Sequence, residues 1–188
     1  MSRILIRLAV LNFCFLLAAF TAGGLSWLHG GLLDREGSVY MWHFSLGLFA
    51  IIFNLGLHCL IFIYFLGTGR WVKEVALAYK LPDDPLPKLT RDLKRRTFPP
   101  SLLAMLLPIG AAAAGMANQN LGKAWAPPLH FGLAILSLLV NGWACRIAYR
   151  NVTVNAGVIA QVTQEAERIR AAHGLPPSAE ALKQADSV

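Results

Sequence analysis

Charged residues are absent from four long stretches of the chain. These stretches are residues 8–33, 37–69, 97–122 and 124–145. About 20 apolar residues of α-helix cross a bilayer core roughly 30 Å thick, so each stretch is long enough to span a membrane once. The pattern predicts an all-α integral membrane protein.

We expect two tandem helical hairpins within residues 1–150. Their four transmembrane helices are placed at 8–28, 40–66, 101–117 and 129–149. A cytoplasmic loop, 67–100, joins the two hairpins, and a cytoplasmic helical tail follows over 151–188.

The loop carries its own helical pattern. Trp71, Val75 and Tyr79 recur every four residues, which predicts a short amphipathic helix lying in the headgroup layer. The glycine-containing run 67–69 is expected to end the second span, and the proline pair at 99–100 to introduce the third.

The tail continues the helical pattern of the fourth span. Val158, Val162 and Ile169 lie on one face, so we expect one long rod that ends near Gly174. Its apolar stripe has three candidate partners: the basic loop, a second copy of the chain, or another subunit.

The composition agrees with the pattern. Hydrophobic residues make up 56% of the chain and charged residues 14%. These values exclude a soluble enzyme and a disordered chain. Three cysteines, all inside predicted spans, form no C-x-x-C motif and exclude a secreted disulfide scaffold.

The basic residues predict an orientation. Of the 17 Lys and Arg residues, all but Arg35 and Lys123 fall on the side that holds both termini and the loop. Because basic residues are retained on the cytoplasmic side, both termini are expected there, with a bacterial inner membrane as the default. The net charge of +7 then indicates contact with lipid headgroups, and no basic soluble domain is present to bind nucleic acid.

The second and fourth spans are similar to each other. Residues 43–58 align with 130–145 at an offset of 87. The identical positions are His43/His130, Phe44/Phe131, Leu46/Leu133 and Asn54/Asn141. Matched histidine and asparagine are the informative pairs, because both residue types are costly inside a membrane.

The matched polar residues share one helix face. Positions i, i+4, i+11 and i+15 stay within a stripe about 60° wide. The stripe holds His43, Gly47, Asn54 and His58 on the second span, and His130, Ala134, Asn141 and Cys145 on the fourth. Both spans run in the same direction, so the two leading histidines lie at a similar depth and converge if the stripes face each other.

Converging imidazoles favour a haem b with bis-histidine ligation. His43 and His130 are the candidate axial ligands. The candidate cofactor-binding residues are Gly47, Asn54, His58, Ala134 and Asn141. Small residues leave room for the flat macrocycle, and the two amides are placed to reach each other, a propionate or a water. Membrane cytochromes of b type are similar in carrying histidines on separate helices, a resemblance of architecture alone.

Other interpretations remain open. The polar stripes are also typical of interhelical hydrogen bonding without a cofactor. A copper site would use His29 and Met116 beside the histidine pair, and His58 is also typical of a satisfied core histidine. Catalytic motifs are absent, so at most a redox subunit of a larger complex is expected. The alternative is a non-catalytic scaffold or assembly subunit that docks other subunits, or a second copy, through its basic loop and C-terminal helix.

Overall fold

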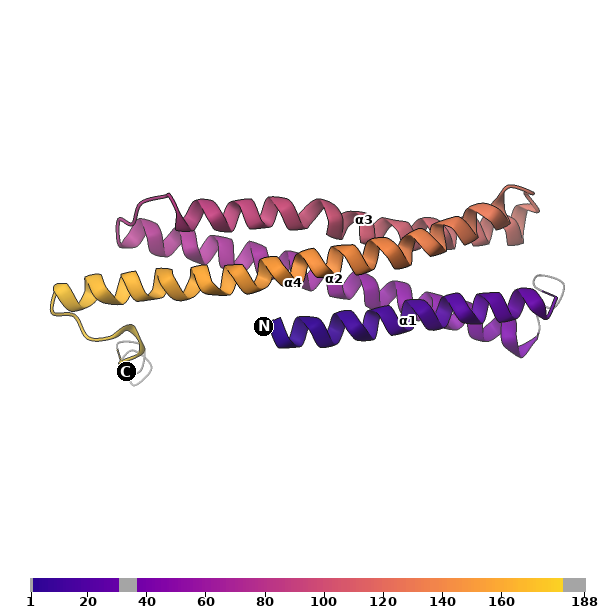
Figure 1. Cartoon of the computed structure of the whole chain (residues 1–188), viewed down its shortest axis with the longest axis horizontal. Coiled ribbons are helices and arrows are strands. Elements are labelled where there is room, and N and C mark those ends of the chain that lie inside the picture. The colour runs from indigo at the N-terminus through magenta and orange to yellow at the C-terminus, as the bar shows by residue number, and fades with distance from the viewer. Residues whose placement is uncertain (1, 31–36, 181–188) are drawn as a thin grey trace. The chain divides into compact units, whose positions relative to one another are not determined.

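The chain folds into four α-helices (Figure 1). The computed structural model describes residues 2–30 and 37–180; Arg35 and Lys183, which entered the charge count, lie outside these ranges. The helices are α1 (Ser2–Leu28), α2 (Ser38–Ala78), α3 (Leu86–Leu121) and α4 (Ala126–Ala172). All four are long and apolar enough to cross a membrane, which confirms the predicted all-α membrane fold of two tandem hairpins.

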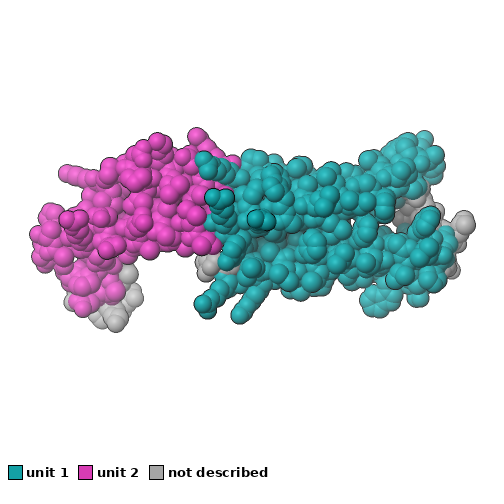
Figure 2. Space-filling model, in the orientation of Figure 1, with its two compact units in different colours: residues 1–63, 96–150 teal, residues 64–95, 151–188 magenta. Residues whose placement is uncertain are grey.

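The helices contribute to two compact units (Figure 2). Unit 1 comprises residues 1–63 and 96–150, and unit 2 comprises residues 64–95 and 151–188. Three helices contribute to both units, since α2, α3 and α4 each run without interruption through a unit boundary.

Unit 1 has large apolar side chains outside and small or polar side chains inside. Trp27, Ile52 and Leu139 are at least 60% exposed, whereas Ala50 and Asn54 are almost fully buried. This distribution suits a lipid environment, because lipid tails solvate apolar side chains and helix association relies on close packing and interhelical hydrogen bonds.

Helix α2 does not end at residues 67–69, where the sequence predicted its end. It continues to Ala78, because packing within unit 2 offsets the low helix propensity of glycine. Thr68 accepts a hydrogen bond from Asn155 Nδ2 at 3.0 Å. A Cβ placed on Gly69 would lie 3.8 Å from Thr90, so α2 and α3 pack closely there.

Helix α3 likewise begins earlier than predicted. It starts at Leu86 and contains the proline pair 99–100 and Pro108 in its interior. A proline removes one N–H donor from the helix but keeps a helical φ. Packing supports the helix here, since the Phe98 ring lies 4.5 Å from that of Phe62 on α2.

Unit 2 has an apolar core that joins α2 to α4. Val72, Val158 and Val162 are buried together, so the stripe of the α4 rod packs on α2. In the amphipathic segment, the sequence predicted a buried face through Trp71. The buried face instead contains Val72 and Ala76, one position further along the helix, and Trp71 remains 38% exposed. Helix α4 forms the expected single rod of 47 residues, and Gly174 follows its end with a positive φ of 68°.

Candidate functional site

Each of the two matched histidines is held by a backbone carbonyl of the preceding helix. His43 on α2 lies 3.0 Å from the Ala19 carbonyl of α1, measured from Nδ1. His130 on α4 lies 2.7 Å from the Ala111 carbonyl of α3, also from Nδ1. Both side chains are partly buried within unit 1.

These hydrogen bonds determine the tautomer. A carbonyl oxygen only accepts, so Nδ1 must carry the proton and donate it. The remaining ring nitrogen, Nε2, then presents a lone pair in neutral His43 and in neutral His130. Among the described residues, neither imidazole makes a second hydrogen bond. An imidazole anchored at Nδ1 with a free Nε2 lone pair is the usual form of a metal-ligating histidine.

The two imidazoles lie next to each other. Their ring centres are 6.0 Å apart, and the ring planes make an angle of 84°. The side chains therefore converge from two helices that are parallel and are separated by 87 residues in the sequence, as the stripe pattern predicted.

A glycine lies against each imidazole. A Cβ on Gly23 would be 2.8 Å from Cε1 of His43, and a Cβ on Gly115 would be 3.1 Å from Nδ1 of His130. The first distance is shorter than real contacts allow, so a side chain at position 23 would force the His43 ring or the helices to shift.

The histidine setting occurs twice in the chain. In each hairpin, an alanine carbonyl on the first helix accepts the histidine proton, and a glycine four residues later contacts the ring. An offset of 92 residues separates Ala19 from Ala111 and Gly23 from Gly115. The resemblance between the hairpins thus extends to α1 and α3, which the sequence comparison of the second and fourth spans did not include.

Space is available one turn from His43. A Cβ built on Gly47 would meet no atom within 4 Å. Gly47 and its counterpart Ala134 are both partly buried. Their cofactor-binding role stays a prediction.

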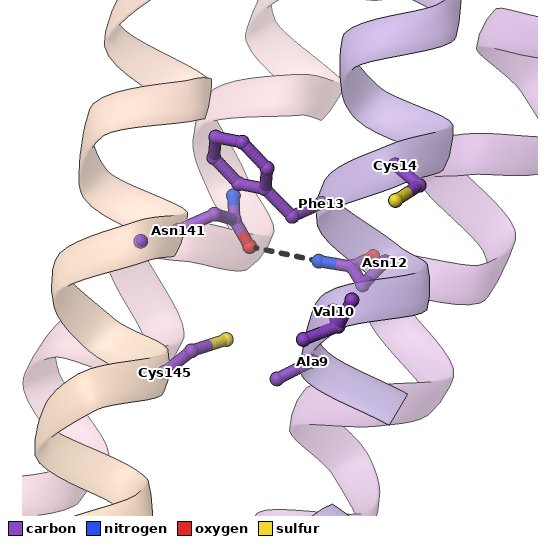
Figure 3. A pocket seen from close by; sticks show the side chains of 8 residues that line it. Ala9, Val10, Asn12, Phe13, Cys14, Asn141 and Cys145 are labelled. Atoms are coloured by element: carbon purple, nitrogen blue, oxygen red, sulfur yellow. Dashed lines mark hydrogen bonds between the residues drawn. The ribbon is translucent and has the colours of Figure 1, made fainter. Parts of the chain in front are cut away.

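A layer of buried amides joins the helices farther along the spans. Asn12 Nδ2 donates to Asn54 Oδ1 at 3.1 Å. It also donates to Asn141 Oδ1 at 3.4 Å (Figure 3). Asn54 and Asn141 both donate to the Ala104 carbonyl, at 2.9 and 3.2 Å. The two predicted asparagines are thus bridged by Asn12 and Ala104.

This amide layer is separate from the histidine pair. Eleven residues separate Asn54 from His43, and the same number separates Asn141 from His130, which is about 16 Å along a helix. The amides in this layer form most of their hydrogen bonds with one another and with the Ala104 carbonyl. The assignment of Asn54 and Asn141 to a cofactor stays a prediction.

His58 belongs to the amide layer. Its Nε2 donates to Asn141 Oδ1 at 3.1 Å, and its Nδ1 is buried without a hydrogen-bond partner among the described residues. Cys145, which the sequence places on the matching stripe of the fourth span, lines a groove with Ala9 and Val10 of α1 (Figure 3).

The histidine pair has no third ligand of the usual kind. Within residues 2–30 and 37–180, no cluster of three or more His, Cys, Asp or Glu side chains could hold a metal ion. His29, a candidate copper ligand, is exposed and bonds through Nδ1 to the Leu25 carbonyl of its own helix.

Sequence reasoning missed three important residues in this part of the molecule: Asn12, Gly23 and Gly115. Asn12 is 1% exposed and stands inside a charge-free span. The cost of burying an amide in a membrane was the signal that could have identified it. The glycines carry no such signal, because glycine is common in transmembrane helices.

No family model, curated protein or solved structure matches the chain.

Proposed function

We propose that this small multi-pass membrane protein is a haem-b-binding electron-transfer subunit. His43 and His130 would be the two axial ligands. The observation that carries the proposal is the pair of imidazoles 6.0 Å apart, each anchored through Nδ1 to a backbone carbonyl.

The distance between the rings suits a shared metal ion. An imidazole nitrogen binds a transition metal at about 2.0–2.1 Å, and the ring centre lies roughly 1.1 Å beyond it, so two opposed imidazoles have centres roughly 6.3 Å apart. The spacing of 6.0 Å is close to this value.

The number of ligands also favours haem over a bare ion. A structural zinc site takes four protein ligands. Only two ligands converge here among the described residues. A porphyrin supplies the other four nitrogen donors itself, so a two-histidine site is sufficient for haem.

The residues of the chain would have distinct tasks. When bound, haem would supply reversible one-electron transfer. His43 and His130 would hold the iron, and the carbonyls of Ala19 and Ala111 would fix the ring orientation and make each imidazole a stronger ligand. The open space beside Gly47 would admit one edge of the macrocycle.

We place the protein in a cell inner membrane with both termini cytoplasmic. Arg3, Arg7, Arg146 and Arg150 lie toward the ends of α1 and of the unit 1 part of α4 that would face the cytoplasm, and Lys123 lies in the opposite connection. With this orientation the histidine pair lies toward the external face. Electrons would then be exchanged with another subunit on that face or with a quinol in the bilayer.

An absorption spectrum of the purified protein tests the proposal. The protein should show a Soret band that shifts on reduction with dithionite, with about one haem per chain. His43→Ala and His130→Ala should each remove the low-spin spectrum, whereas His29→Ala, at an exposed histidine, should leave it unchanged. A colourless protein after expression with sufficient haem, or a spectrum that survives both substitutions, would reject it.

The scaffold interpretation is supported by a different observation. The amides of Asn12, Asn54 and Asn141, with the Ala104 carbonyl, join α1, α2, α3 and α4 without any cofactor. Its docking surface has less support, because Val158 and Val162 of the C-terminal helix pack on Val72 of the same chain. A colourless protein that loses a co-purifying subunit when residues 152–188 are deleted would favour this function.

A further inference from the structure

A narrow apolar groove lies between α1 and α4 (Figure 3). Its volume is about 240 Å³. The lining residues are Ala9, Val10, Asn12, Phe13, Cys14, Asn141, Gly142 and Cys145. All of them belong to unit 1 and to helices that can span the membrane. The groove is thus placed where lipid acyl chains lie.

Four arginines flank one end of this groove. The Asn12–Asn141 hydrogen bond sets the register of α1 against α4. Arg7 and Arg146 each lie five residues from that bond, which is about 7.5 Å along the helix axes, in the same direction. Arg3 and Arg150 each lie nine residues away, at about 13.5 Å. The arginines therefore form two matched levels directly beyond the groove.

Arg3, Arg7 and Arg146 also lie on the open side of the groove. At 100° per residue, Arg3 is within 20° of Val10 on α1, and Arg7 is within 20° of Cys14. On α4, Arg146 is 40° from Gly142, on the side away from buried Asn141. All four arginine side chains are exposed.

These guanidinium groups have no counter-ion in the described part of their own unit. Residues 2–30, 37–63 and 96–150 contain no Asp or Glu. The ion pairs of the described residues involve other basic side chains. The charge of the cluster is therefore available to an anion from outside the protein.

We propose that the α1–α4 groove and its arginines form a binding site for one anionic phospholipid. The phosphate lies between Arg7 and Arg146, with Arg3 and Arg150 at the headgroup level beyond it. One acyl chain lies in the groove along Val10 and Gly142. Arginine suits this task because its planar guanidinium binds phosphate oxygens in pairs. The site is independent of haem and requires only that the helices span a membrane.

Native mass spectrometry of the full-length, delipidated protein in detergent tests the site. The protein is titrated with phosphatidylglycerol and with phosphatidylcholine that carry the same acyl chains. We expect one tightly retained phosphatidylglycerol and only weak retention of phosphatidylcholine. Arg7→Gln combined with Arg146→Gln should weaken phosphatidylglycerol binding roughly 20- to 30-fold. Lys123→Gln, which removes a basic residue at the opposite end, should leave it unchanged.

A second pair of variants tests the groove without changing charge. Gly142→Leu places a side chain toward Phe13, whose ring lies 4.0 Å from a Cβ at this position, and should weaken phosphatidylglycerol binding. Gly132→Leu on the same helix, where a Cβ meets nothing within 4 Å, should leave the binding unchanged.

Three results would overturn the inference. The first is equal retention of the two lipids, and the second is unchanged phosphatidylglycerol binding by the arginine variant or by Gly142→Leu. The third is equally tight binding of glycerol 3-phosphate, the headgroup without acyl chains, which would show an anion site that does not use the groove. If the double arginine variant does not fold, Gly142→Leu and the two lipid comparisons still decide the question.

Discussion

The ring centres of His43 and His130 lie 6.0 Å apart, although 87 residues separate the two side chains in the sequence. Each ring is anchored independently, to Ala19 in one hairpin and to Ala111 in the other. Two hairpins with the same histidine setting thus meet at one point. Substitutions that disturb either anchor should therefore move one imidazole relative to the other.

The first prediction concerns Gly23. Gly23→Ala would place a Cβ 2.8 Å from Cε1 of His43, so the ring or the helices must shift. Overpacking of this kind costs about 1–3 kcal/mol, against a gain of up to about 1 kcal/mol from better helix propensity. We expect a net destabilisation, measured by reversible unfolding in mixed micelles.

Gly24 provides the matched control for this substitution. A Cβ on Gly24 meets nothing within 4 Å, so Gly24→Ala should be neutral or stabilising. Gly115→Ala, with a closest distance of 3.1 Å to His130, should have an intermediate effect. Equal stability changes for Gly23→Ala and Gly24→Ala would contradict the close contact with His43.

The second prediction concerns Asn12, which holds the amide layer together. Asn12→Ala removes the hydrogen bonds to Asn54 at 3.1 Å and to Asn141 at 3.4 Å. Interhelical hydrogen bonds in membranes contribute about 0.6–2 kcal/mol each, so the free energy of unfolding should fall by roughly 1–3 kcal/mol. The same unfolding assay in micelles measures the loss.

Thr21→Ala is the control for Asn12. The Thr21 hydroxyl is exposed and bonds at 3.0 Å to the Ala18 carbonyl of its own helix. Its removal should change the unfolding free energy by less than about 0.5 kcal/mol. A comparable effect of both variants would show that the Asn12 amide contributes no interhelical stabilisation.

Much of this architecture could be predicted from the chain because the decisive signals are local. Charge-free runs identify membrane spans directly, since the cost of burying a charge in lipid is large. The convergence of His43 and His130 also follows from local rules, namely helical periodicity and the equal direction of two spans.

Features that depend on distant contacts could not be predicted in this way. Local propensity favours an end to α2 near Thr68, but the helix continues through a packed segment where Asn155, 87 residues later, donates to that hydroxyl. Gly23 is indistinguishable in sequence from Gly24, and only the position of His43 separates their roles. Tertiary packing outweighs propensity at both places.

The third prediction concerns the dependence of stability on pH. Arg91 donates two hydrogen bonds of 2.6 Å to the Asp83 carboxylate. These bonds favour the ionised form and hold the pKa of Asp83 below its ordinary value. The stabilising contribution is thus complete above the unfolded-state pKa of about 3.9, and it is lost as the pH falls through the lower folded-state pKa.

Asp83→Asn should therefore weaken the fall in melting temperature on acidification. The variant should melt earlier than the parent at neutral pH and approach it at low pH. Arg91→Gln should have the same effect, because it removes the other partner. The difference will be small, since both side chains are about half exposed or more. A melting difference that grows toward low pH would contradict the assigned direction.

The fourth prediction concerns the segment after α4. The Ser178 amide donates to a Glu167 carboxylate oxygen at 3.2 Å, and the Ser178 hydroxyl donates to the same oxygen. Arg170 also donates to the Pro176 carbonyl, at 3.0 and 2.6 Å. These bonds fold the segment back on the helix, so Glu167→Ala should accelerate hydrogen exchange of the Ser178 amide about five- to tenfold.

Glu165→Ala removes a nearby carboxylate whose closest approach to Arg168 is 3.9 Å, and it should leave that exchange rate unchanged. Equal exchange rates in the parent and in Glu167→Ala would show that the carboxylate does not hold the segment in solution.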